Sequence, residues 1–156
     1  LGLGIGVTIL GLSDLVFMAH GARVKCPFTD LALAPEAASS FTFPAIMGRQ
    51  NAMWTLLSSQ WLSAEECLSM GLAFKLCSDE ELLDITMDHA QILAAKPISS
   101  LIASKKLIMD PIRERIQAAR KDEDSAFAEL LGKPANLEAL QAFAEKRDPD
   151  FSRLGE

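Results

Sequence analysis

Few residues in this sequence are suited to metal or disulfide chemistry. The 156 residues include three cysteines, two histidines and no tyrosine. Cys26, Cys67 and Cys77 are odd in number and match no metal-ligand spacing, so they indicate free thiols in a reducing, cytosol-like compartment. His20 and His89 lie far apart, and neither has a Cys or His partner nearby in the sequence. We therefore expect no metal site.

Basic runs are missing as well. The 21 acidic residues outnumber the 15 lysines and arginines, which gives a formal net charge of −6. The cations are spread along the chain and form no stripe interleaved with aromatic residues, which is the pattern of many nucleic-acid-binding surfaces. Nucleic acid is therefore not an expected partner.

The apolar opening segment, residues 1–19, lacks the marks of a signal peptide or a membrane anchor. It has no basic n-region. Glycines and Asp14 interrupt it, whereas a membrane-spanning helix needs about 20 successive apolar residues. We expect a buried helix that leads into a buried strand, and no membrane partner. Because the chain starts inside this run without a methionine, we also expect an N-terminal portion of a larger domain to precede it.

The chain has enough apolar residues for a sizeable core in a single domain, since 49% of its residues are hydrophobic. Compact apolar runs predict strands at residues 15–18 and 22–26 and an extended segment at 72–76. Capping-box sequences at 63–66 and 78–81 predict two helix starts. Further helices are expected over 36–47, with a start or kink at Pro44, over 51–58, from Pro97 to a break at Pro111, over 112–131 and over 137–146.

Gly2, Gly4 and Gly6 alternate at the start of the chain, ahead of an apolar run that begins at Val7. This spacing lets another backbone or a ligand approach closely, and the following helix offers free N–H groups. It does not match the dinucleotide-binding fingerprint, because Val7 stands where the third glycine belongs and no strand is expected before it.

Glu36 is the strongest functional candidate in the chain. It is a single carboxylate within a stretch of apolar and small residues, 31–44. Burial in such surroundings raises the pKa of a carboxyl group toward the range useful for proton transfer. The alternative is structural, since a Glu just after Pro35 is common in the first turn of a helix, where the helix dipole favours it. The local pattern by itself favours the structural interpretation.

The order of these motifs resembles the second half of the crotonase, or enoyl-CoA hydratase/isomerase, superfamily. The resemblance covers essentially the whole chain. Within the superfamily, the chain looks most similar to the Δ3,Δ2-enoyl-CoA isomerases. The motifs that carry it, in order, are Gly2-Leu3-Gly4-Ile5-Gly6, Ser13-Asp14, Ala22-Arg23-Val24, Cys26-Pro27-Phe28-Thr29, Leu33-Ala34-Pro35-Glu36, Ser39-Ser40-Phe41-Thr42-Phe43-Pro44, Ser63-Ala64-Glu65-Glu66-Cys67, Gly71-Leu72 and the run from Glu138 to Arg147.

The resemblance implies an α/β fold in two parts. Residues 1–95 would form the C-terminal part of a crotonase-like spiral of ββα units, and residues 96–156 a helical region that mediates trimerisation. The expected assembly is a homotrimer, or a hexamer made of two trimers.

The resemblance also implies a site for an acyl-CoA substrate. Coenzyme A is then part of the substrate, and no separate cofactor is expected. The thioester oxygen would bind two backbone N–H groups, one of them the amide of Ile5 between Gly4 and Gly6, and the other upstream of Leu1. Phe28 and Phe41, with Phe43, are candidate walls of the substrate site.

The same resemblance makes Glu36 the catalytic base of an isomerase that moves a 3-enoyl-CoA double bond to the 2-trans position during fatty-acid β-oxidation. Hydratases of this family use two glutamates, and the matching positions here are Thr8 and Phe28, so hydration by the usual mechanism is not expected. In one departure from the pattern, Ala37 replaces the glycine that often follows the catalytic glutamate.

Three alternatives stay open from the sequence. The chain resembles enoyl-CoA hydratases and other acyl-CoA enzymes of the superfamily. It also resembles the non-catalytic crotonase-like domains of chromodomain Y-like proteins, although those lack the catalytic residue. A fragment that serves only in oligomerisation is the third alternative. For the compartment we expect a bacterial cytoplasm or a mitochondrial matrix, because the end Leu154-Gly155-Glu156 is not a peroxisomal signal.

Overall fold

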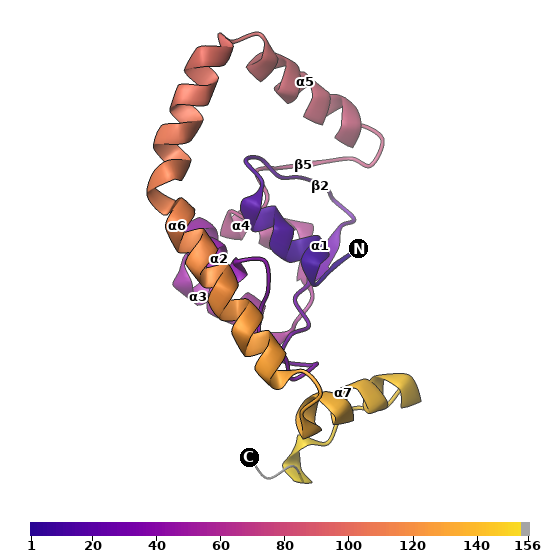
Figure 1. Ribbon diagram of the computed structural model, residues 1–156. Coiled ribbons are helices and arrows are strands. Elements are labelled where there is room, and N and C mark those ends of the chain that lie inside the picture. Colours follow the sequence, from indigo (N-terminus) through magenta and orange to yellow (C-terminus); the bar gives the residue numbers. More distant parts are fainter. Residues whose placement is uncertain (154–156) are drawn as a thin grey trace.

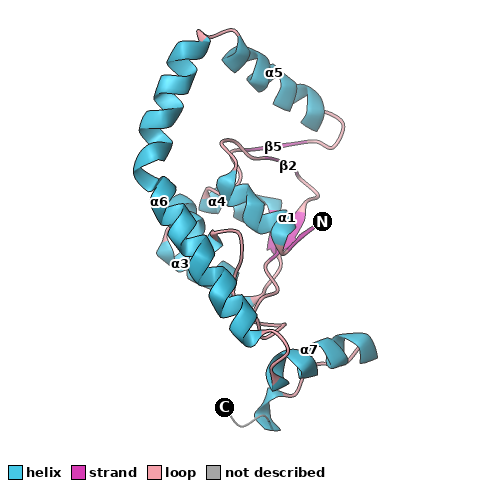
Figure 2. Ribbon diagram, viewed as in Figure 1, coloured by secondary structure: helices cyan, strands magenta, loops and turns pink. Residues whose placement is uncertain are grey.

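Very short strands and short helices make up the first half of the chain, and longer helices make up the second (Figures 1 and 2). The computed structural model describes residues 1–153. The strands are β1 (Gly2–Leu3), β2 (Phe17–Ala19), β3 (Arg23–Lys25), β4 (Leu62–Ser63) and β5 (Lys75–Cys77). The helices are α1 (Ile5–Thr8), η1 (Ile9–Leu12), α2 (Ser39–Met47), α3 (Arg49–Ser58), α4 (Ala64–Met70), α5 (Leu82–Ala94), α6 (Ile98–Leu130), α7 (Pro134–Glu145) and η2 (Phe151–Arg153).

The strands form two small sheets, β1-β3-β4 and β2-β5. β1 and β3 pair in parallel, with Gly2 opposite Val24, and β4 pairs antiparallel to β3, with Leu62 opposite Val24. Parallel strands need a crossover between them. Here that crossover contains α1, η1 and β2, so α1 begins directly at the carboxyl end of β1.

The core lies between these sheets and helices α2 to α4. Its largest fully buried apolar side chains are Phe43, Leu62 and Val7. α6 packs against α2 and runs along one side of the body, while α7 extends away from the body at the lower end (Figure 1). Asn136 anchors the start of α7, because its Nδ2 donates to the carbonyl of Leu31 at 2.8 Å.

The opening segment is less buried than its sequence predicts. Val7 and Thr8 are fully buried, but six large apolar side chains are exposed. A strand, β1, does precede the glycine-rich turn, so the expectation of no strand there was wrong. A two-residue strand is defined by its pairing with β3, and local sequence carries no signal for that. The six exposed side chains are Leu1, Leu3, Ile5, Ile9, Leu12 and Leu15.

α6 is one continuous helix, so the expected break at Pro111 was wrong. A proline inside a helix removes one hydrogen bond and tends to kink the helix. α6 changes direction between its N-terminal and C-terminal halves (Figure 1). Ile108 before the proline and Ile112 and Ile116 after it line one cavity, so both halves of the helix border the same space.

α2 begins at Ser39, so the expected helix start at Glu36 was wrong. Ala37 and Ala38 adopt left-handed φ angles of 57° and 58°, which interrupt any helix before them. Glu36 therefore lies in a loop, and its interpretation as a first-turn helix residue fails. Pro44 lies within α2, and Gly48 separates α2 from α3 as predicted.

The two capping-box sequences differ in outcome. Ser63 and Glu66 form the predicted box at α4. The Glu66 N–H donates to Ser63 Oγ at 3.2 Å, and the Ser63 N–H donates to the Glu66 carboxylate at 2.7 Å. At the second sequence the Ser78 hydroxyl accepts from the Glu81 N–H, yet it donates to the Glu81 carboxylate, and α5 begins only at Leu82. That pair forms a turn before the helix.

Other boundaries shift by a few residues. The strand expected at 15–18 lies at Phe17–Ala19, and the extended segment expected at 72–76 becomes a strand at Lys75–Cys77, which pairs with it. β4 was not expected, and α7 begins at Pro134, three residues earlier than predicted.

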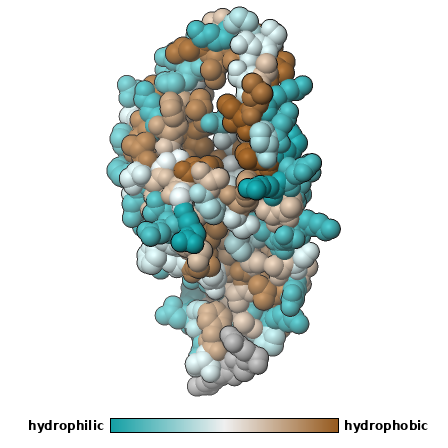
Figure 3. Space-filling model, turned by 90° about the vertical axis from the view of Figure 1, so that its left-hand side faces the viewer, coloured by the Kyte–Doolittle hydropathy of each residue, from teal (hydrophilic) through white to brown (hydrophobic). Residues whose placement is uncertain are grey.

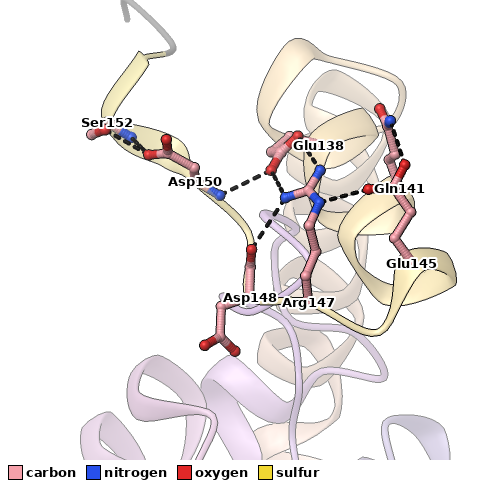
Figure 4. Close-up of polar contacts among 7 residues, drawn as sticks. All are labelled: Glu138, Gln141, Glu145, Arg147, Asp148, Asp150 and Ser152. Atoms are coloured by element: carbon pink, nitrogen blue, oxygen red, sulfur yellow. Dashed lines mark hydrogen bonds and ion pairs between the residues drawn. The ribbon is translucent and has the colours of Figure 1, made fainter.

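Charged contacts tie the segment after α7 back onto that helix (Figure 4). The guanidinium of Arg147 donates to both carboxylate oxygens of Glu138, at 2.6 and 3.1 Å, and to Glu145 at 2.6 Å. The N–H of Asp150 donates to the same Glu138 at 2.9 Å. Hydrogen bonds from Gln141 and Arg147 lower the pKa of Glu145.

Residues 154–156 lie outside the described residues, and the expectation about a peroxisomal signal falls on them. The division of the chain at residues 95 and 96 stays a prediction. Within residues 1–153, no helix combines the length and apolarity needed to cross a bilayer.

Candidate active site

The Glu36 carboxylate lies against the glycine-rich turn that begins α1. Its Oε1 is 3.5 Å from the point where a β-carbon on Gly4 would lie. Gly4 has a φ of +53°, a conformation that glycine adopts far more easily than other residues. The Gly4 carbonyl accepts from the N–H groups of Val7 and Thr8, at 2.9 and 3.0 Å, and so closes the first turn of α1. Two predicted site residues, far apart in sequence, therefore meet here.

The first amides of α1 are available beside this carboxylate. The N–H groups of Ile5 and Gly6 are in the first turn, where a helix supplies no acceptor of its own. No atom lies within 4 Å of the point where a β-carbon on Gly6 would lie, so the surface there is open. The Ile5 side chain is 53% exposed. An oxygen atom at this turn would find amide donors close to Glu36.

A cavity of about 410 Å³ is lined by both Ile5 and Glu36. One wall comes from α1 and η1, the second from the loop that carries Glu36, and the third from α6. The α6 wall brings two charged side chains, Arg120 and Asp124, whose Nε and Oδ2 are 3.9 Å apart. The lining residues are Ile5, Ile9, Leu12, Glu36, Ala37, Ala38, Ile116, Gln117, Arg120 and Asp124.

The pKa of Glu36 is raised above its ordinary value. Burial is the larger cause, and the negative charge of Glu123 is the second. The Glu36 side chain is half-buried, and no hydrogen bond or ion pair to its carboxylate is found among residues 1–153. A partly buried carboxylate of raised proton affinity is a stronger base than a fully solvated one, which suits it to accept a proton from a substrate.

The family model for enoyl-CoA hydratase/isomerase matches residues 1–153 of the chain. The chain belongs to the enoyl-CoA hydratase/isomerase family. An enoyl-CoA hydratase/isomerase from Pseudoalteromonas atlantica, known from a crystal structure, is 37% identical to this chain in sequence. The two structures superimpose with a TM-score of 0.92, and the match covers 96% of this chain and 60% of that one. The expected crotonase-like α/β fold is thereby confirmed.

Two other members of this family differ in the activity that they are named for. Enoyl-CoA delta isomerase 2 of Rattus norvegicus is 30% identical over 144 residues, which cover 92% of this chain and 37% of the relative. An enoyl-CoA hydratase from Mycobacterium marinum is 59% identical, with a TM-score of 0.67, over 70% of this chain and 51% of that one. The chain thus spans between about a third and three fifths of the length of these relatives.

The phenylalanines expected to line the substrate site take different positions in this chain. Phe28 and Phe43 are buried in the core and do not line the cavity beside Glu36. Phe41 lines a second cavity. Core packing accounts for the position of Phe28, and its role as a substrate contact stays a prediction.

The second cavity, also about 410 Å³, lies between η1, α2 and the N-terminal half of α6. It shares Leu12 and Ile116 with the cavity beside Glu36, so the two are neighbours. Its wall is mainly apolar, with the ion pair of Asp14 and Lys105 at 2.5 Å. The remaining lining residues are Gly11, Ser13, Phe41, Thr42, Ala45, Ile46, Leu101, Ser104, Ile108, Met109 and Ile112.

Sequence reasoning missed the contribution of α6 to this site. Arg120, Glu123 and Asp124 belong to a charged run on a long helix, and such runs usually face solvent. Only the chain fold brings them beside a loop more than eighty residues earlier. The unusual feature is Glu123, which is buried although its neighbours are exposed.

Proposed function

We propose that this chain is the catalytic part of an enoyl-CoA isomerase that moves a double bond from the 3,4 to the 2-trans position of an acyl-CoA. The observation that carries the proposal is the position of Glu36, a half-buried carboxylate beside the first amides of α1. The delta isomerase from rat, 30% identical to this chain, supports the same choice.

In the proposed mechanism the thioester oxygen accepts a hydrogen bond from the Ile5 N–H. This bond stabilises the negative charge that develops when a C2 proton leaves. Glu36 takes that proton, and the electron pair of the C2–H bond delocalises over the thioester and the neighbouring double bond as a dienolate. The protonated Glu36 returns the proton to C4, which leaves the double bond between C2 and C3. No net oxidation, reduction or added water is involved.

The surroundings of Glu36 serve this proton transfer in two ways. Burial raises its pKa, so the carboxylate is a stronger base for the C2 proton. Ile5, Ile9, Leu12 and Ile116 line the cavity with apolar side chains, which offer no hydrogen-bond partners to water beside the dienolate. The reaction needs no metal or separate cofactor, because coenzyme A is part of the substrate.

The second cavity supports an extended acyl chain as the substrate. It adjoins the Glu36 cavity through Leu12 and Ile116, and its wall is mainly apolar. In this proposal the reacting carbons lie beside Glu36, and the far end of the acyl chain enters the space between η1, α2 and α6.

Hydration of a 2-enoyl-CoA is the second candidate function. The 59% identical relative from Mycobacterium marinum is named a hydratase, and Asp124 supplies another carboxylate to the Glu36 cavity. Against it, the positions matching the hydratase glutamates are Thr8 and Phe28, which are both buried and carry no acid. A purely non-catalytic role of the chromodomain Y-like type is disfavoured by the presence of Glu36.

The proposed assembly is a homotrimer or hexamer. Exposed apolar side chains on α3, namely Met53, Trp54 and Leu57, support an interface, because contiguous apolar surface is rare on monomers. Hydrophobic side chains also surround a hollow on the face of the molecule in Figure 3.

The proposed compartment is a bacterial cytoplasm or a mitochondrial matrix.

An assay with paired substrates tests the proposal. The full-length protein is given 3-hexenoyl-CoA in one reaction and 2-trans-hexenoyl-CoA in another, and products are separated by chromatography. The isomerase predicts conversion of the first to 2-trans-hexenoyl-CoA and negligible hydration of the second. Rapid formation of 3-hydroxyhexanoyl-CoA from the second substrate would establish the hydratase instead, and no reaction with either would support a non-catalytic role.

A further inference from the structure

Glu123 is a buried carboxylate that holds the loop next to Glu36. Its side chain is 5% exposed, although it belongs to a charged stretch of α6. Oε2 accepts from the Ala38 N–H at 2.5 Å, and Oε1 accepts from the Ser40 N–H at 2.7 Å. No lysine or arginine among the described residues forms an ion pair with it. Both of its oxygens are therefore used by one turn of backbone, at the start of α2.

This turn has an unusual conformation that needs support. Ala37 and Ala38 both have left-handed φ angles, which non-glycine residues rarely adopt. Hydrogen bonds to a charged acceptor are stronger than those between neutral groups. Because Glu36 immediately precedes the turn, the direction of its side chain depends on how the turn is fixed.

We propose that Glu123 is a positioning residue, which holds the Ala37–Ala38 turn and thereby keeps the Glu36 carboxylate against Gly4. The inference deepens the proposed function, on which it rests for the role of Glu36. Glu123 does not touch the reacting atoms in this account. It acts through the loop and through its charge.

The charge of Glu123 gives the proposal a second consequence. That charge raises the pKa of Glu36, after the larger effect of burial. The other titratable groups around Glu36 are few. Arg120 and Asp124 face the same cavity from α6 as an exposed pair. Cys26 interacts with Glu36 and has a pKa raised to about 12, so the thiol stays neutral. The residues that α1 and η1 contribute to the cavity are all apolar.

The test uses three variants of the full-length protein. Glu123→Gln removes the charge and one of the two acceptors, and Glu123→Asp keeps the charge but shortens the reach. Asp122→Asn is the matched control, because it makes the same charge change on an exposed neighbour. The pH dependence of kcat/KM with 3-hexenoyl-CoA is measured for each, together with hydrogen exchange of the peptide that contains residues 38–40.

For Glu123→Gln we expect the acid limb of the pH profile to move to lower pH, with kcat reduced on the order of tenfold and KM nearly unchanged. For Glu123→Asp we expect a lower kcat, with the acid limb of the pH profile at the same pH as in the wild type. Both should exchange the 38–40 amides faster than Asp122→Asn. If Glu123→Gln fails to fold, the aspartate variant and its amide exchange carry the test.

The proposal is overturned if both Glu123 variants match Asp122→Asn in kcat, pH profile and amide exchange. Amide exchange does not depend on turnover. A wild-type protein that lacks isomerase activity but shows Glu123-dependent protection of residues 38–40 would refute the proposed function alone.

Discussion

Oε1 of Glu36 lies 3.5 Å from the position that a β-carbon would occupy on Gly4. The candidate base and the helix start that we propose as the oxyanion donor thus lie close together. Each comes from a separate segment, Gly4 at the carboxyl end of β1 and Glu36 in the loop before α2. Changes at position 4 should therefore affect both the backbone and the catalytic site.

Gly4→Ala should lower stability and activity together. Its φ of +53° disfavours any residue with a β-carbon, and strain of this kind costs about 1–3 kcal/mol. The 3.5 Å spacing to Glu36 is ordinary van der Waals contact, so backbone strain is the dominant effect. We expect a matching loss of unfolding free energy in urea. We also expect a fall in kcat/KM of roughly tenfold or more, because the Ile5 amide is displaced.

Gly21→Ala is the matched control for this substitution. Gly21 has no positive φ and nothing within 4 Å of its β-carbon position. The unfolding free energy of the Gly21→Ala variant should stay within about 0.5 kcal/mol of that of the wild type. Equal losses for both variants would mean that the conformation of Gly4 has no special role.

Removing the charge at position 36 should stabilise the protein at neutral and alkaline pH. The pKa of Glu36 is raised in the folded state, so its ionised form is less favourable there than in the unfolded chain. Wild type therefore loses stability relative to Glu36→Gln as the pH rises through the folded-state pKa. We expect the Tm difference between the two proteins to grow from acidic to mildly alkaline pH. A difference that is independent of pH would contradict the raised pKa.

Filling the second cavity should select against long acyl chains. Ile112 lines that cavity and not the one beside Glu36. Ile112→Trp should reduce kcat/KM for 3-dodecenoyl-CoA on the order of tenfold or more, while 3-hexenoyl-CoA changes by about twofold or less. Leu107→Trp is the control, because Leu107 is exposed on α6 and lines neither cavity. Equal effects on both substrates would place the acyl chain elsewhere.

The hydroxyl of Thr42 offers a test of the packing around η1. It is buried without a hydrogen-bond partner among the described residues, and it lies against Gly11. Replacing an unsatisfied buried hydroxyl by a methyl group removes a desolvation penalty of about 1–3 kcal/mol. Thr42→Val should therefore raise the unfolding free energy. Thr55→Val, whose hydroxyl contacts Met47 Sδ at 3.8 Å, should gain less. Destabilisation by Thr42→Val would show that the hydroxyl has a partner.

Elements with a strong local signal were predictable from the sequence. The Ser63 capping box and the break at Gly48 are set by residues within one turn of each other, and both are present. β1 and β4 were missed because two-residue strands depend on pairing with β3 rather than on their own residues. Pro111 misled for the opposite reason. A proline can remain inside a helix at the cost of a hydrogen bond, and α6 continues through Pro111 with a change of direction.

The candidate site shows the same division. Glu36 was identifiable because a lone carboxylate in an apolar stretch is conspicuous in the sequence. Its surroundings were not, because the α6 wall comes from residues more than eighty positions later. Ala37 and Ala38 are ordinary helix formers by propensity, so nothing local announced their left-handed turn. The partner that supports the turn, Glu123, resembled any other charge on a solvent-exposed helix.

The most direct test of the central claim is the turnover of 3-hexenoyl-CoA by Glu36→Gln in the full-length protein. Glu114→Gln, an exposed position on α6, serves as the control for the same chemical change. If Glu36 transfers the proton, kcat should fall by about 10²–10⁴-fold, with the fold and substrate binding retained. Turnover within a few-fold of the control variant would contradict the account.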